Sequence, residues 1–209
     1  MGMVVMEPTW DKYGQWDKIA QLESLHEVKS AITGSRKAWR PNFVPPALEY
    51  VFDYAADEQR AAGTNPCVLD FGCGLARNAP MLRKFFPRVV GVDLPEMIER
   101  LKQARPDVIG NLYDQLYVSV PEATSRETFS VVYDSVVLQH IINRSVVSEI
   151  IDALAAVKSL RTFVSLSNFG AVPTHFGILE ERRWVIWHKE DERLSFEGAP
   201  HTVTIFRRW

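Results

Sequence analysis

The sequence predicts an α/β fold in which a mostly parallel β-sheet carries helices on both faces and ends in an antiparallel hairpin. Short apolar runs typical of buried strands alternate with segments whose apolar residues recur at three- and four-residue spacing, as in amphipathic helices. The run at 68–71 leads through Gly72 and Gly74 directly into such a helical pattern. Near the C-terminus, two apolar stretches flank a turn at 197–200 and predict the hairpin.

Two helices are expected before the first strand. From Trp16 to Ile32, apolar residues fall on one helical face, and the pattern ends at Gly34. A second helical face follows a loop with three prolines, and its apolar members are Leu48, Val51, Phe52 and Ala55. We expect one domain, 1–209, composed of a helical N-terminal segment at 1–62 and a core at 63–209.

The core is expected to hold five strands before the hairpin. The expected strands are 68–71, 89–92, 108–112, 129–133 and 162–166, and the hairpin pairs 183–188 with 202–206. The third strand is the least clearly marked, and 118–120 is an alternative position for it. Helices are expected between the strands, at 79–86, 95–104 and 146–157.

The composition is that of a soluble globular protein, with 46% hydrophobic and 24% charged residues among 209. A net charge of -2 argues against a mainly electrostatic nucleic-acid binder. No apolar run approaches the roughly 20 residues that span a bilayer, and the N-terminus lacks the pattern of a signal peptide. Cys67 precedes the first strand and Cys73 lies in the glycine turn, where a disulfide would constrain the turn, so free thiols and a cytoplasmic location are expected. No zinc-ligand spacing occurs.

The turn after the first strand has the features of a ligand-binding loop. Glycines lack a Cβ, so Gly72 and Gly74 let a ligand approach the backbone at the carboxyl end of the strand. Arg77 breaks the dinucleotide fingerprint G-x-G-x-x-G/A, Asp70 would repel a pyrophosphate, and no P-loop Gly-Lys-Ser/Thr follows. Asp93 ends the second strand, where an acid can accept both hydroxyls of a ribose. The two acids therefore bracket an adenosine-type ligand.

At these positions the chain resembles the class I S-adenosylmethionine-dependent methyltransferases. Their first motif, an acid followed by x-G-x-G, is matched by Asp70, Gly72 and Gly74, and their ribose-binding acid is matched by Asp93. Their fourth strand is similar to residues 129–141, FSVVYDSVVLQHI, whose ending is common in the small-molecule branch. The resemblance covers residues 67–167 and implies a Rossmann-like, mostly parallel seven-stranded sheet with a C-terminal antiparallel hairpin.

The resemblance also implies S-adenosylmethionine as the cofactor. Asp70 would hold its amino-acid end and Asp93 its ribose, although each acid could instead cap the helix that follows it. The turn residues expected to contact the cofactor are Gly72, Cys73, Gly74 and Asn78, the last of which could only cap the helix.

Further along the chain, Leu94 and Met97 would pack on the adenine or simply on the sheet. Asp114 would accept the adenine amino group, as the acid after the third strand does in the family, or remain a solvated loop acid. The residues expected to line the methionine end and the methyl group are Asp134, Ser135 and Val136.

The methyl acceptor is less clearly marked. His140 could serve as general base for a hydroxyl acceptor, given the near-neutral pKa of histidine, or it could only form a hydrogen bond with the backbone of the next loop. Arg40 could bind the cofactor carboxylate or an anionic acceptor, or be solvated. The family's N-terminal lid implies a role for 1–62 over the site, and the residues that would shape an acceptor pocket are Trp10, Tyr13, Trp16, Trp39 and the stretch 168–181.

The resulting prediction is a methyltransferase that modifies an oxygen or nitrogen of a small molecule. The Asn/Asp-Pro-Pro-aromatic motif of amino-methylating nucleic-acid enzymes is missing after the fourth strand. The alternatives are an enzyme that modifies RNA or protein, and a regulatory protein that binds the cofactor without turnover. The identity of the acceptor and the oligomeric state are left open.

Overall fold

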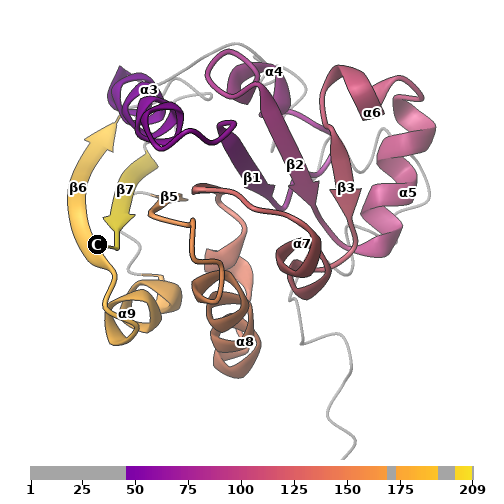
Figure 1. Ribbon diagram of the computed structural model, residues 1–209. Helices are drawn as coiled ribbons and strands as arrows, with labels where there is room; N and C mark the ends of the chain where they lie inside the picture. Colours follow the sequence, from indigo (N-terminus) through magenta and orange to yellow (C-terminus); the bar gives the residue numbers. More distant parts are fainter. Residues whose placement is uncertain (1–45, 169–172, 193–200, 209) are drawn as a thin grey trace, which may run out of the picture.

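The computed structural model describes residues 46–168, 173–192 and 201–208, and these contain a seven-stranded sheet of order β3-β2-β1-β4-β5-β7-β6 (Figure 1). The strands are β1 (Cys67–Phe71), β2 (Arg88–Val92), β3 (Gln115–Tyr117), β4 (Val131–Ser135), β5 (Thr162–Asn168), β6 (Val185–Glu192) and β7 (His201–Arg207). Parallel pairing joins β3, β2, β1, β4 and β5 in that order, whereas β7 is antiparallel to both β5 and β6. The predicted mostly parallel sheet with a closing hairpin is confirmed.

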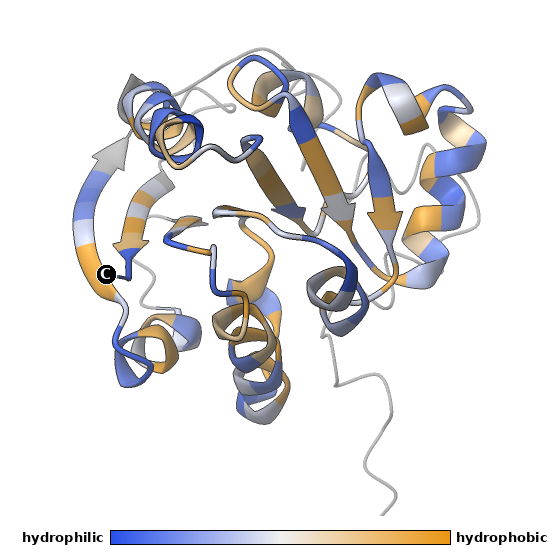
Figure 2. Ribbon diagram, viewed as in Figure 1, coloured by the Kyte–Doolittle hydropathy of each residue, from blue (hydrophilic) through white to orange (hydrophobic). Residues whose placement is uncertain are grey.

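Helices cover both faces of this sheet (Figure 1). One face carries α3 (Pro46–Ala61), α4 (Ala79–Leu82), α5 (Pro95–Ala104) and α6 (Val108–Asn111). The other carries α7 (Val120–Arg126), α8 (Arg144–Ala155) and α9 (Thr174–Glu181). Because side chains alternate along a strand, Val68 joins the apolar core of the first face and Leu69 that of the second. Figure 2 shows the expected result, with largely hydrophobic central strands and helices of mixed polarity.

The second expected N-terminal helix is α3, and it is a core helix. Its apolar residues Leu48, Val51, Phe52 and Ala55 are at most 3% exposed. The Phe52 ring packs edge-on against Phe86 and Tyr133, with centroids 5.6 and 5.7 Å away. The first expected helix and the other residues up to 45 lie outside the described residues. Among the described residues, no helix combines the length and apolarity that crossing a membrane requires.

The expected third strand is wrong at both suggested positions. Residues 108–111 form the short helix α6, which is interrupted where Ile109 has ψ 130° and Gly110 has φ 88°. Glycine adopts that positive φ without a steric penalty, so the chain turns here instead of extending. Val120 begins α7, whose N-cap Ser119 accepts a hydrogen bond from the Glu122 amide. The strand itself is β3 at 115–117, between the two suggested positions.

Candidate active site at the carboxyl edge of the sheet

The carboxyl ends of three strands meet at one edge of the sheet. β1 lies between β2 and β4 and runs parallel to both, with Phe71 in register with Val92 and Asp134. The segments that follow these strands are the glycine turn 72–78, residues 93–94 and residues 136–140. The edge therefore brings together most of the predicted site. The hydrogen bonds within the protein determine which polar groups at this edge keep capacity for a ligand.

Asp70 is fully buried near the end of β1. Its Oδ2 accepts a hydrogen bond of 2.6 Å from the Tyr113 hydroxyl, whereas its Oδ1 has no hydrogen-bond partner among the described residues. Burial raises the pKa of Asp70 to about 7, against the opposing effects of the Tyr113 hydroxyl and the neighbouring Asn78 side chain. Asp70 is thus a carboxyl group with one unused oxygen and a proton affinity in the neutral range.

Gly91 makes room for the tyrosine that reaches Asp70. It pairs with Asp70 across the β1–β2 ladder, and a Cβ built on it would lie 3.1 Å from the Tyr113 ring and 2.7 Å from Leu116. Both contacts are closer than carbon atoms normally approach, so only glycine lets the ring lie against the sheet here. Tyr113 is fully buried by this arrangement.

The glycine turn is shaped by backbone conformations that favour glycine. Gly72 and Gly74 have φ values of 68° and 52°. A Cβ on Gly72 would also lie 2.3 Å from a methyl carbon of Val137, which follows β4. The amides of Gly72 and Cys73 both donate to the Val92 carbonyl, at 2.9 and 3.1 Å. The turn is therefore fixed between the ends of β2 and β4.

Asp93 connects this turn to the start of α5. Its Oδ2 accepts a hydrogen bond of 2.6 Å from the Gly74 amide, and its Oδ1 accepts one of 2.8 Å from the Leu94 amide. Burial raises the pKa of Asp93 to about 6, although both amide hydrogen bonds favour the charged form. A carboxylate offers about four acceptor positions, so each oxygen keeps capacity for another donor.

Arg77 extends from the glycine turn to the end of β4. Its guanidinium donates to the Ser135 hydroxyl at 3.2 Å and carries positive charge close to Asp70. Asn78 occupies the N-cap of α4, but its side chain makes no capping hydrogen bond there. The side chain predicted to exclude a dinucleotide is therefore a structural link across the edge.

The turn after β4 contains a strained residue. Val136 has φ 66°, a left-handed conformation that is unusual for a β-branched side chain and costs of order 1–3 kcal/mol. Its amide donates to the Leu166 carbonyl at 3.0 Å, which helps to hold it there. The 3₁₀ turn η2 (Leu138–His140) follows and carries His140. Strain of this kind is concentrated at functional sites.

His140 is partly exposed at the end of η2. Its Nε2 lies 3.1 Å from the Gln139 amide nitrogen. Partial burial lowers the pKa of His140, which keeps more of the imidazole neutral near pH 7, as a general base requires.

Asp134 does not line the methyl site as expected. Its side chain lies on the face covered by α8 and α9 and is fully buried. Its Oδ1 accepts hydrogen bonds from the amides of Val137 and Leu138, at 3.0 and 3.1 Å. Its Oδ2 accepts one of 3.0 Å from the Ser165 hydroxyl, so both oxygens serve the protein's own structure.

Asp114 lies at the opposite end of the sheet. It precedes β3 instead of following it, and its Oδ2 accepts a 2.8 Å hydrogen bond from the amide of Val89, near the start of β2. The same oxygen forms an ion pair of 2.9 Å with Arg83. The prediction that Asp114 reaches the adenine is wrong because the third strand was misplaced.

The remaining predicted residues are placed as follows. Met97 is 2% exposed in the core cluster, whereas Leu94 packs against that cluster and stays partly exposed. Cys73 is buried, and its carbonyl accepts from the Ala76 amide, so it packs behind the turn. Arg40, the aromatic residues from 10 to 39 and residues 169–172 of the second suggested pocket lie outside the described residues.

Sequence reasoning missed Tyr113, Ser165 and His175. Tyr113 lies in an irregular segment, and its only sequence signal is Gly91, a glycine inside an apolar strand, which indicates a close approach by another group. Ser165 is a polar residue within the apolar run of β5, on the same face as Phe163. His175 belongs to the stretch 168–181, which is expected to shape an acceptor pocket, and no sequence signal pairs it with Ser165.

Comparisons with known proteins agree with this fold. The family model described as "Methyltransferase domain" matches residues 38–172. No curated protein matches the sequence significantly. Among solved structures, magnesium protoporphyrin IX methyltransferase from Synechocystis PCC 6803, with bound SAM, has 16% identity and a TM-score of 0.58, with 95% of this chain and 97% of that chain covered.

Two further structures have the same fold. The N-methyltransferase NodS from Bradyrhizobium japonicum, in complex with S-adenosyl-L-homocysteine, has 15% identity and a TM-score of 0.57, over 93% of this chain and 98% of that one. Precorrin-6y C5,15-methyltransferase from Geobacter metallireducens has 12% identity and a TM-score of 0.53, over 83% and 93%. At these identities the likeness establishes the fold, and the family match covers more than half of the chain. The chain therefore belongs to the methyltransferase-domain family and has the fold of the class I S-adenosylmethionine-dependent methyltransferases.

Proposed function

We propose that this methyltransferase binds S-adenosylmethionine at the carboxyl edge of β1, β2 and β4 and transfers its methyl group to an oxygen or nitrogen of a small molecule. The observation that carries the proposal is the Asp93 carboxylate. It ties the glycine turn to α5 through Gly74 and Leu94, yet it keeps acceptor capacity on both oxygens. Those two acceptors suit the two hydroxyls of a ribose.

Asp70 and the glycine turn support the same cofactor. The unused Asp70 Oδ1 would be satisfied by a hydrogen-bond donor, and the ammonium of the cofactor's amino-acid end is a charged donor. Because Asp70 is fully buried, the ammonium reaches it only when a covering side chain moves. Gly74, with φ 52° and no Cβ, leaves backbone accessible beside Asp93.

The chain's own residues bind and orient the reactants. The cofactor, when bound, supplies an electrophilic methyl carbon on a sulfonium. Holding the acceptor in line with that carbon contributes roughly 7–11 kcal/mol in well-oriented systems. The turn after β4, with the strained Val136 and with Ser135 held by Arg77, is the protein surface that we assign to this positioning.

We assign His140 the role of general base for a hydroxyl or protonated amine acceptor. The support is its position at the end of η2, its partial exposure, and a pKa lowered by partial burial. A neutral imidazole can take the acceptor's proton as the methyl group arrives, and such help contributes about 10²–10⁴-fold in rate.

The direct test uses the full chain with methyl-labelled S-adenosylmethionine, a panel of small-molecule alcohols and amines, bulk RNA and a protein mixture. The proposal expects label in the small-molecule fraction. Label confined to RNA or protein would contradict it and support the macromolecular alternative. Cofactor binding without any transfer would support the regulatory alternative.

A variant pair tests the base. His140→Gln is expected to lower turnover about 10²–10⁴-fold with unchanged affinity for the cofactor. The matched control is His188→Gln, which alters an exposed histidine on β6 and is expected to have no effect. Equal activity of both variants would remove His140 from the mechanism.

A further inference from the structure

A buried polar cluster connects β4, β5 and α9 behind the proposed active site. Asp134 and Ser165 are in register on neighbouring strands, and the Ser165 hydroxyl donates to Asp134 Oδ2 at 3.0 Å. His175, in the first turn of α9, places its Nε2 3.0 Å from the same hydroxyl and 3.7 Å from Asp134 Oδ2. All three side chains are fully buried.

The hydrogen-bond roles in this cluster follow from proton counting. The Ser165 hydroxyl has one hydrogen, which it gives to Asp134, so it accepts the hydrogen of His175 Nε2. This fixes the neutral imidazole in the tautomer protonated at Nε2, and Nδ1 has no partner among the described residues. Burial lowers the pKa of His175 to about 3, in agreement with a neutral ring.

The cluster controls the orientation of one carboxylate. Asp134 Oδ2 is held by Ser165, and Oδ1 accepts the amides of Val137 and Leu138, which begin the turn that carries His140. The strained Val136 lies between Asp134 and these amides, so the turn depends on the carboxylate to keep its shape.

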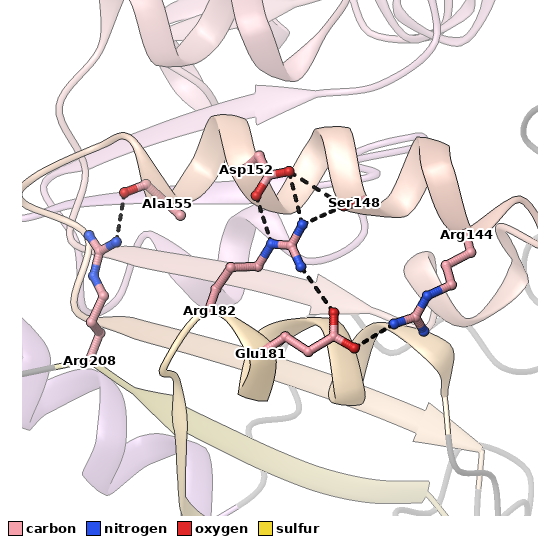
Figure 3. A network of polar contacts seen from close by, with 7 residues as sticks. All are labelled: Arg144, Ser148, Asp152, Ala155, Glu181, Arg182 and Arg208. Atoms are coloured by element: carbon pink, nitrogen blue, oxygen red, sulfur yellow. Dashed lines mark hydrogen bonds and ion pairs between the residues drawn. The ribbon is translucent and has the colours of Figure 1, made fainter.

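The far end of α9 is anchored independently to α8 (Figure 3). Arg182 donates to Asp152 at 2.6 and 3.0 Å and also bonds Ser148. Glu181 accepts a hydrogen bond of 2.7 Å from Arg144. Because α9 is fixed at this end, its first turn can hold the His175 ring against β5.

We infer that Ser165 and His175 are positioning residues, which orient the Asp134 carboxylate and through it the turn 136–140 that presents His140 to the methyl acceptor. The inference rests on the proposed function, in which the turn 136–140 presents the general base His140 to the acceptor. Both residues are fully buried, so we assign neither of them a contact with the cofactor or the acceptor.

The test compares Ser165→Ala with a matched control, Ser167→Ala. Ser167 lies two residues further along β5, is also fully buried, and has a hydroxyl without a hydrogen-bond partner among the described residues. We expect Ser165→Ala to lower hydrogen-exchange protection of the Val137 and Leu138 amides at least about tenfold relative to the Val132 amide of β4. Ser167→Ala should leave that ratio unchanged.

A second set of variants tests the histidine and guards against misfolding. His175→Phe keeps a ring but no donor, and should reproduce the effect of Ser165→Ala, whereas His175→Gln keeps a donor and should restore protection. The NMR titration of the His140 ring should shift in Ser165→Ala and His175→Phe only, a readout that general loss of packing does not produce.

These outcomes separate the inference from the proposed function. Calorimetric binding of S-adenosylhomocysteine should stay within about twofold of wild type in all of these variants, since none of them removes a group assigned to the cofactor. The positioning role would be overturned if Ser165→Ala and Ser167→Ala lowered the hydrogen-exchange protection equally. It would also be overturned if the protection of the Val137 and Leu138 amides stayed unchanged in both Ser165→Ala and His175→Phe. Failure of the wild-type protein to bind S-adenosylhomocysteine would instead overturn the proposed function.

Discussion

Replacing Asp70 with asparagine should make the protein more stable and its cofactor binding weaker. The side chain is fully buried, and burial raises its pKa from 3.8 to about 7. Asparagine has nearly the same shape and can still accept the Tyr113 hydrogen bond. It removes the cost of a buried charge but also the negative charge proposed to hold an ammonium.

The sign of the pH dependence follows from the raised pKa. Below the unfolded value both states are protonated and Asp70 costs nothing, whereas above about pH 7 the folded state bears the full cost of the charge. A shift of this size corresponds to at most about 4 kcal/mol. Asp70→Asn should therefore gain about 2–4 kcal/mol over wild type near pH 8.5, and the gain should disappear near pH 4.

Urea unfolding at the two pH values measures this gain, and calorimetry with S-adenosylhomocysteine measures affinity. Affinity should fall about 10- to 100-fold, the loss expected for one charge-assisted hydrogen bond. Asp53→Asn, an exposed change on α3, is the control and should stay within about 0.5 kcal/mol of wild type. A stability difference that is the same at both pH values would show that the folded state carries no costly charge on Asp70, and unchanged affinity would show that Asp70 does not hold the ammonium.

Three other predictions concern the contacts around this edge. Tyr113→Phe should lower the free energy of unfolding in urea by about 1–3 kcal/mol, because it removes the 2.6 Å hydrogen bond to a fully buried carboxyl group; no change would mean that the buried hydrogen bond is unimportant. Gly72→Ala should lower the free energy of unfolding by more than about 2 kcal/mol, because the new Cβ clashes with Val137 and the positive φ is strained. Adding Val137→Ala should recover the loss due to the clash but not the loss due to the positive φ, and full recovery of wild-type stability would argue against backbone strain. Arg182→Ala should cost only about 0.2–1 kcal/mol, less at high salt, since both carboxylates that Arg182 pairs with are exposed; a larger loss in thermal unfolding would contradict this.

The sequence predicted the elements whose local pattern agrees with their final environment. The buried strands and the helix at 95–104 follow from apolar periodicity, and the edge of the sheet follows from parallel connections. The third strand was missed because only three residues pair and only Tyr117 of them is buried, so no apolar run marks them. Val108 and Ile109 favour a strand by residue type, but Gly110 turns the chain beside them, so no strand forms there.

The sequence predicted the site residues that lie in the turns directly after the strands. It did not predict those whose role depends on contacts between residues far apart in the chain. Gly72 and Asp93 lie next to strand ends, so sequence position alone locates them. The Tyr113–Asp70 hydrogen bond joins residues 43 positions apart, and its existence depends on the space above Gly91. The expectation for Asp134 follows from its position after the fourth strand, whereas the side-chain alternation that it shares with Val132 places it on the face covered by α8 and α9.

We propose that Asp93 holds the ribose of S-adenosylmethionine at the carboxyl edge. Calorimetric titration of wild type, Asp93→Ala and Asp114→Ala with S-adenosylmethionine measures whether it does. Asp114 is the matched control, since it is a partly exposed acid at the opposite end of the same sheet. We expect saturable binding to wild type, an affinity at least about tenfold lower in Asp93→Ala, and an affinity within about twofold of wild type in Asp114→Ala. No heat with wild type, or equal losses in the two variants, would contradict it.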